Sequence, residues 1–134
     1  MPSDAHQSLE RERYVSLETF RKDGTGVRTP IWFARMQRDG EDVLVAMTNG
    51  NSYKVKRLRR NPAIKVAACN MSGKEILGPF HDGKGEILED PETIREAARL
   101  LRRKYSWQWR LMEVIAWFGR RQRQWVYLSM ALDQ

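Results

Sequence analysis

The chain has 134 residues, of which 41% are hydrophobic and five are Trp, so it can build one core without disulfides or structural metals. Cys69 is the single cysteine, which excludes an intrachain disulfide and favours a cytoplasmic protein. The sequence contains no apolar run near the ~20 residues of a transmembrane helix and no signal-peptide core. We expect one domain over residues 1–134, with residues 1–8 frayed.

The formal net charge of +7 would suit nucleic acid, an acidic membrane surface or a small anion. Five of the seven residues from Lys54 to Arg60 are basic, so much of this charge lies in one short segment. No helix-turn-helix or RNA-binding signature accompanies it, which makes nucleic acid an unfavoured partner. The sequence therefore favours a small-molecule anion and predicts no membrane association.

Strand signals dominate the first third of the chain. Alternation over Tyr14–Phe20 and β-branched and aromatic residues over Val27–Ala34 predict a hairpin with its turn at Asp23-Gly24. Pro30 would weaken a central strand. The wholly apolar run Val43–Met47 predicts a third, buried strand.

The segment after Met47 suits a phosphate. Asn49 begins a turn, and a helix is expected to start at Ser52, whose side chain would cap the first turn. Free backbone amides and the helix dipole favour an anion there, and Thr48 and Lys54 add a hydroxyl and a cation. The alternative is a solvated basic helix with an ordinary Ser cap.

The remaining elements alternate between strand and helix. Ile64–Cys69 and Phe80–Leu88 predict two more strands, and Asp90-Pro91 predicts a helix start. A further helix over Trp107–Phe118 and a last strand over Trp125–Leu132 complete the chain. Six strands with inserted helices indicate an α+β, mainly β fold in which the strands close into an antiparallel barrel.

Catalytic side chains are scarce. The sequence lacks a Ser-His-Asp arrangement, an HExxH motif, zinc-ligand spacing and a P-loop. Cys69 is predicted to be a core residue and His81 a structural or solvated one. Among the tryptophans, Trp32 and Trp107 are preferred over the others as walls of a ligand pocket. Such a chain would leave redox chemistry to a bound cofactor.

The order Thr48-Asn49-x-x-Ser52-x-Lys54 after a strand resembles the phosphate-binding segment of the pyridoxamine 5'-phosphate oxidase-like superfamily, the FMN-binding split barrels. The segments Tyr14–Thr25, Val27–Phe33 and Lys54–Pro62 resemble its branch of F420-dependent oxidoreductases. The resemblance runs from about Tyr14 to Leu88 and continues more weakly through Lys104–Gln108.

This resemblance implies a six-stranded antiparallel split β-barrel, paired as a homodimer with the cofactor at the interface. It implies an F420-dependent oxidoreductase that transfers a hydride between F420 and a small unsaturated or electron-poor substrate. An FMN-binding oxidase or reductase and a non-catalytic flavin- or F420-binding protein are the alternatives. The implied cofactor-binding residues are Thr29, Pro30, Ile31, Trp32, Thr48, Asn49, Ser52, Lys54, Lys56, Arg57 and Trp107. No metal ligand and no catalytic side chain is assigned.

Overall fold

The chain forms seven strands and two longer helices within the residues that the computed structural model describes, which are 6, 9–50, 52–111 and 125–133. In chain order they are β1 (Tyr14–Phe20), β2 (Gly26–Ile31), β3 (Ala34–Arg38), β4 (Glu41–Asn49), α2 (Tyr53–Arg60), β5 (Ala63–Cys69), β6 (His81–Ile87), α3 (Pro91–Tyr105) and β7 (Trp125–Leu132).

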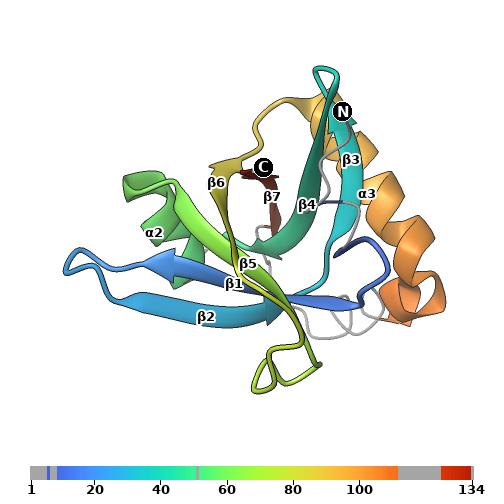
Figure 1. Cartoon of the computed structure of the whole chain (residues 1–134). Helices are drawn as coiled ribbons and strands as arrows, with labels where there is room; N and C mark the ends of the chain where they lie inside the picture. Colours follow the sequence, from blue (N-terminus) through green and yellow to red (C-terminus); the bar gives the residue numbers. More distant parts are fainter. Residues whose placement is uncertain (1–5, 7–8, 51, 112–124, 134) are drawn as a thin grey trace.

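All seven strands belong to one antiparallel sheet with the order β2-β1-β5-β6-β7-β4-β3. Its two edge strands, β2 and β3, follow one another in the chain and are joined by Trp32 and Phe33. The sheet curls round on itself, but no ladder joins β2 to β3 within the described residues (Figure 1). The predicted α+β, mainly β split barrel is confirmed, whereas the expected number of six strands is wrong, because the described residues form seven.

The extra strand arises because the run Val27–Ala34, predicted as one strand, is divided at Phe33. The Phe33 N–H donates a hydrogen bond of 3.0 Å to the hydroxyl of Tyr105 on α3. That hydroxyl also lies 3.0 Å from the Phe33 carbonyl oxygen and 2.7 Å from that of Arg13, and its single proton serves both. The helix thus replaces the sheet as the hydrogen-bond partner of Phe33. Pro30 lies in the edge strand β2, where its missing N–H is tolerated.

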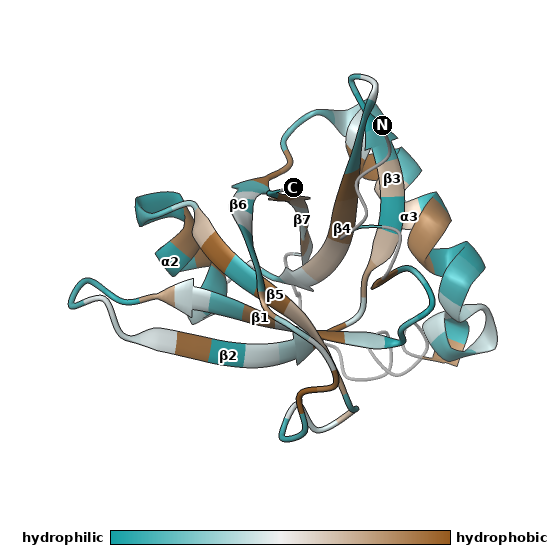
Figure 2. Ribbon diagram, in the orientation of Figure 1, coloured by the Kyte–Doolittle hydropathy of each residue, from teal (hydrophilic) through white to brown (hydrophobic). Residues whose placement is uncertain are grey.

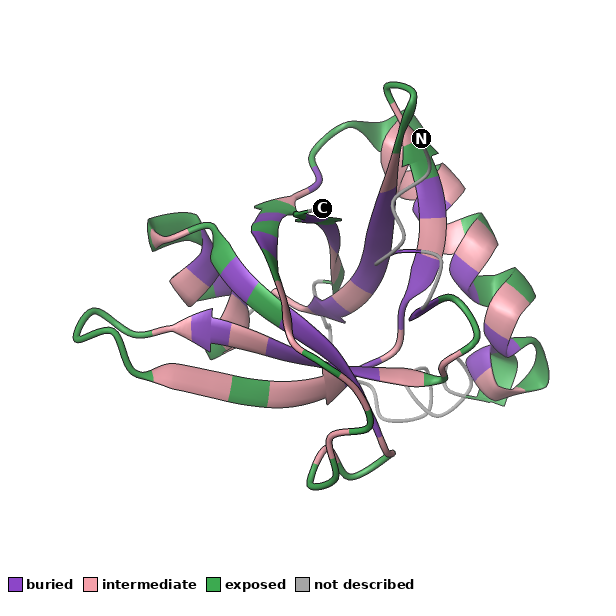
Figure 3. Ribbon diagram, in the orientation of Figure 1, coloured by how far each residue is buried: buried purple, intermediate pink, exposed green. Residues whose placement is uncertain are grey.

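Strand β4 is buried on both faces, which explains its unbroken apolar run (Figures 2 and 3). Leu44 and Ala46 face the core inside the curled sheet. Val43 and Val45 face a second cluster under α3, which includes Ala97, Leu101, Tyr105 and Trp109. The side chains of these four helix residues recur every four positions, so one stripe of α3 and of the turn after it covers the strand.

The helix starts predicted at Ser52 and at Asp90-Pro91 are close to the observed ones. Asp90 caps α3 by accepting a 3.0 Å hydrogen bond from the Thr93 N–H, with Pro91 in the first turn. Helical turns continue at residues 107–111, and the rest of the predicted helix Trp107–Phe118 lies outside the described residues. Cys69 is buried in the core, as predicted. No helix within the described residues is long and apolar enough to cross a membrane.

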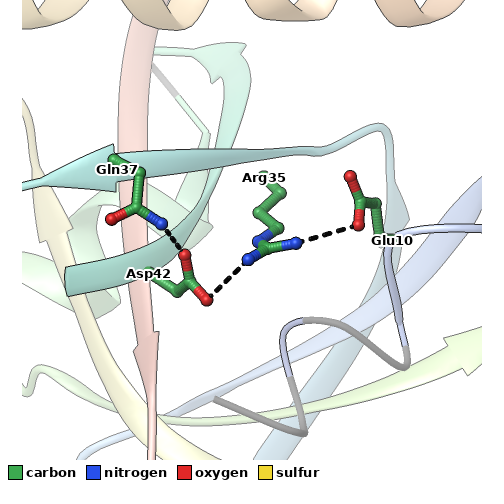
Figure 4. Close-up of polar contacts among 4 residues, drawn as sticks. All are labelled: Glu10, Arg35, Gln37 and Asp42. Carbon is green, nitrogen blue, oxygen red and sulfur yellow. Dashed lines mark hydrogen bonds and ion pairs between the residues drawn. The ribbon is translucent and has the colours of Figure 1, made fainter. Parts of the chain in front are cut away.

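A polar network ties the chain near Glu10 to the β3–β4 hairpin (Figure 4). Arg35 lies 3.1 Å from the Glu10 carboxylate and 2.9 Å from that of Asp42, which also accepts a hydrogen bond from Gln37. Of residues 1–8, expected to be frayed, only His6 is described; its buried Nε2 accepts a 3.2 Å hydrogen bond from the Leu132 N–H. The other seven lie outside the described residues.

Replacing Tyr105 by Phe is expected to lower the free energy of unfolding by about 2 kcal/mol. The change keeps the ring and removes the hydroxyl, so buried backbone groups of Phe33 lose their partner. Urea unfolding measures the loss. Tyr53→Phe is the matched control, because Tyr53 is 72% exposed and should change stability by less than about 0.5 kcal/mol. Equal, small changes in both variants would show that the Tyr105 hydroxyl does not hold the β2–β3 break.

Lys104 provides a second prediction, on pH. Its ammonium lies 3.5 Å above the centre of the Phe33 ring, buried and without a hydrogen-bond partner among the described residues. Burial, reinforced by Arg13, lowers the pKa of Lys104 from 10.5 to about 8. The folded protein therefore releases a proton between these pH values that the unfolded chain keeps. Stability should rise by about 2 to 3 kcal/mol as the pH increases through this window.

Lys104→Met should flatten this rise and stabilise the protein below pH 8, because it removes a buried charge and keeps the apolar stem. Thermal unfolding between pH 7 and 10.5 measures it. Lys22→Met, at an exposed turn, should leave the pH dependence as it is. A parent and a Lys104→Met variant with the same pH slope would contradict the assignment.

Candidate functional site

A cleft of about 250 Å³ opens where β2 and β4 end beside the start of α2. Its lining comes from β2, the β2–β3 link, β4, α2, the turn after α3 and β7, and consists of Pro30, Ile31, Trp32, Met47, Thr48, Asn49, Lys54, Trp109 and Trp125. Six of the eleven residues named from the sequence lie in this lining: Pro30, Ile31, Trp32, Thr48, Asn49 and Lys54. The fold thus gathers most of the predicted residues, which come from three separate parts of the chain, around one space.

One end of the cleft is the connection from β4 to α2. The Ser52 N–H donates a 3.0 Å hydrogen bond to the Asn49 carbonyl, which closes a tight turn directly after the strand. Ser52 occupies the N-cap position of α2 with extended backbone angles, φ −71° and ψ 153°. Its side chain makes no capping hydrogen bond, so the predicted Ser cap is wrong. The hydroxyl is nevertheless buried and has no partner among the described residues, and Ser52 is not one of the residues that line the cleft.

A buried hydroxyl without a partner is unfavourable in a folded protein, and such groups are typically satisfied by a ligand or water. Ser52 is also where the first free amides of α2 lie, so its surroundings favour an anion. Thr48, only 7% exposed, adds a second hydroxyl at the end of β4. Thr29 on β2 carries another buried hydroxyl without a described partner, but it does not line the cleft.

Lys54 supplies the charge at this end. Its side chain lines the cleft, and no carboxylate among the described residues forms an ion pair with it. Burial, together with the nearby guanidinium of Arg57, lowers the pKa of Lys54. A half-buried ammonium that has only a cation nearby gains most from an anionic ligand, because the ligand restores the missing counter-charge.

The two basic residues that follow point elsewhere. Lys56 is exposed, with its ammonium 5.2 Å from the centre of the Tyr53 ring. Arg57 faces β1, where its Nε donates a 2.6 Å hydrogen bond to the Thr19 hydroxyl. Neither lines the cleft. The structure therefore separates Lys54 from the rest of the basic segment.

Aromatic rings form the opposite end. Trp32 stacks on Tyr105 with ring centres 4.4 Å apart and planes 9° from parallel, and Trp109 lies 6.1 Å from Trp32. Trp125 joins them from β7, where it pairs with Asn49 across the ladder. Trp107 is 67% exposed and lines a different cleft. Flat apolar walls of this kind suit a planar ring system.

Three lining residues were not among those named from the sequence: Met47, Trp109 and Trp125. The burial of Trp109 could have been predicted from the sequence, since it continues the four-residue spacing of the buried positions on α3. No such pattern identifies Trp125, because its place beside Asn49 depends on the register between β4 and β7. Both line the same cleft as the predicted residues, whereas Trp107 does not.

Within the part of the chain that the structure describes, the cleft lining holds no Asp, Glu, His or Cys. The described residues also contain no cluster of three or more His, Cys, Asp or Glu that could hold a metal ion. The side chains that line the cleft can bind, position and shield a ligand.

Comparisons with known proteins agree with this architecture. A search of curated proteins finds no match. Among solved structures, a conserved hypothetical protein from Mycobacterium tuberculosis superposes with a TM-score of 0.68 at 20% identity, covering 100% of this chain and 82% of that one. A heme storage protein from Vibrio cholerae gives 0.66 at 11% identity, covering 100% and 92%. An F420 reductase gives 0.57 at 20% identity, covering 100% and 97%.

At these identities the solved structures show a shared fold. The family model for pyridoxamine 5'-phosphate oxidase matches residues 1–127, nearly the whole chain. The split-barrel sheet, the β4–α2 connection and this match agree, and the chain belongs to the pyridoxamine 5'-phosphate oxidase family.

Proposed function

We propose that this protein is an F420-dependent oxidoreductase that transfers a hydride between F420 and a small, unsaturated or electron-poor molecule. The half-buried Lys54, which lines the cleft without an ion-pair partner among the described residues, is the observation that carries the proposal, and the buried Ser52 hydroxyl at the N-cap of the same helix supports it. A phosphate at this point would accept hydrogen bonds from both side chains and from the first amides of α2. Thr48 and Asn49 border the same end.

The planar ring would lie against the aromatic part of the lining, formed by Trp32, Trp109 and Trp125. Bound F420 would supply the hydride chemistry, as a deazaflavin does. The chain's own contribution is to hold the phosphate, to orient the ring and to exclude water with its aromatic walls. Tyr105, stacked on Trp32, fixes the indole in one orientation.

The choice of F420 rests on the resemblance of the chain's segments to that branch and on the likeness to an F420 reductase. An FMN-binding oxidase or reductase is the second candidate, because Ser52, Thr48 and Lys54 suit a single phosphate. A flavin- or F420-binding protein without turnover is the third. A heme-storage role, which the likeness to such a protein would suggest, is less favoured, because the described residues of the cleft lining include no His or Cys to ligate iron.

A cofactor titration of the parent protein tests the function. We expect F420 to bind more tightly than FMN, and Lys54→Ala to weaken binding of both by about 2 to 3 kcal/mol, the scale of a charge-assisted hydrogen bond and the anion left unpaired. Absorbance and fluorescence titrations at low and high salt give the dissociation constants. Exposed Lys56 would contact the longer anion of F420, so Lys56→Gln should flatten the salt dependence for F420 alone.

Arg59→Ala is the matched control for this titration, since Arg59 is an exposed cation on the same helix and does not line the cleft. It should change both affinities less than twofold. Tighter binding of FMN than of F420 at every salt concentration would move the assignment to the FMN enzyme. Binding of neither, or equal losses for Lys54→Ala and Arg59→Ala, would overturn the phosphate site.

We also propose that two copies pair as a homodimer with the cofactor at the interface. Large apolar side chains are exposed around the cleft, among them Tyr53 at 72% and Trp125 at 36%. A second copy that covers them would enclose a cleft now open to solvent. Sedimentation velocity at micromolar concentration, with cofactor bound, should show a dimer, and Trp125→Lys should shift it towards monomer. A parent that sediments as monomer alone would contradict the pairing.

A further inference from the structure

A second cleft, of about 430 Å³, adjoins the first. It is lined by Arg102, Arg103, Ser106, Trp107, Trp109 and Arg110. Trp109 lines both clefts, so this arginine groove begins where the aromatic end of the first cleft stops. Lys54 and Thr48 line the first cleft and not the groove. Trp109 therefore stands between a proposed phosphate end and a separate cluster of guanidinium groups.

The groove is made by the way α3 ends. Ser106 follows its last residue with φ 50°, a left-handed conformation that is unusual for a residue other than glycine. Its carbonyl then accepts hydrogen bonds from the N–H groups of Trp109 at 3.1 Å and Arg110 at 3.3 Å, which starts a new helical turn. Arg110 is thereby carried to the same groove as Arg102 and Arg103 from the last turn of α3.

Cations in the last turn of a helix stabilise its dipole without any ligand, which would account for Arg102 and Arg103. It does not account for Arg110, which belongs to the next turn. Nor does it account for Trp107, whose indole is 67% exposed on the same wall. Among the described residues, no carboxylate lines the groove. Guanidinium groups beside an exposed aromatic ring match a planar molecule that carries a carboxylate or phosphate.

We propose that the arginine groove binds the anionic group of an aromatic substrate, whose ring reaches the cofactor past Trp109. This inference rests on the proposed function and adds the substrate class to it: a planar, electron-poor organic anion. A substrate fits the groove better than the cofactor tail does, because the cofactor's phosphate is assigned to the Ser52 end of the other cleft. The tail of F420 follows its phosphate, so it would extend from the phosphate end of the first cleft, away from the cofactor's ring.

Two probes of the same shape test the groove: 4-nitrobenzoate and its neutral counterpart 4-nitrobenzamide. Quenching of tryptophan fluorescence gives their dissociation constants, with and without F420, and reduced F420 gives the rate of hydride transfer. The parent should bind the carboxylate about tenfold more tightly than the amide, the scale of one charge-assisted hydrogen bond. Arg110→Gln and the double variant Arg103→Gln/Arg110→Gln should reduce this preference stepwise. Arg59→Gln, the same change at an exposed position outside both clefts, should keep it.

Equal affinities for the two probes in the parent would overturn the proposal that the groove binds an anion. An equal loss of the carboxylate preference in Arg59→Gln would overturn it as well. A fall in F420 affinity in the double variant, with carboxylate binding unchanged, would assign the arginines to the cofactor tail instead. The two proposals fail separately. If neither F420 nor FMN binds, the fluorescence preference for the carboxylate still reports on the groove, because it is measured without cofactor.

Discussion

The hydroxyl of Tyr105 holds together the part of the fold on which the candidate site depends. It bonds to the backbone of Phe33 at the point where β2 gives way to β3. The ring of the same residue stacks on Trp32, the first residue of the break. One side chain of α3 thus contacts both the backbone at the β2–β3 break and the indole that lines the cleft there.

The strand β4 links the core to the site. Its central residues are packed on both faces, and this double packing leaves the strand little freedom to shift or tilt. The polar residues Thr48 and Asn49 come directly after this rigid segment, followed by the tight turn to Ser52. Binding groups at the end of such a strand are held in well-defined positions, because the strand that supports them does not move.

The basic charge of the chain is used unevenly. Lys54 and Lys104 are both half-buried, and burial lowers the pKa of both, yet one lines a cleft beside an unsatisfied hydroxyl and the other lies over the ring of Phe33. Binding an anion would offset the desolvation cost of Lys54. The desolvation cost of Lys104 is offset in part by its cation–π contact with Phe33. Arginines at the end of α3 are instead exposed and gathered by a strained turn. Burial, more than the count of cations, distinguishes these roles.

The sequence by itself determined the secondary structure, the family and most of the cleft. Apolar runs, turn residues and helix starts are local properties of the sequence. The segment from Val43 to Lys54 contains all three of these patterns. The tertiary structure decided what depends on contacts distant in sequence. Tyr105 divided one predicted strand into two, because its hydroxyl reaches Phe33 from 72 residues away. The register of β7 on β4 brought Trp125 to the cleft, and packing turned Arg57 towards Thr19. Such pairings are set by which surfaces meet when the sheet curls, and no periodicity in a single chain segment records them.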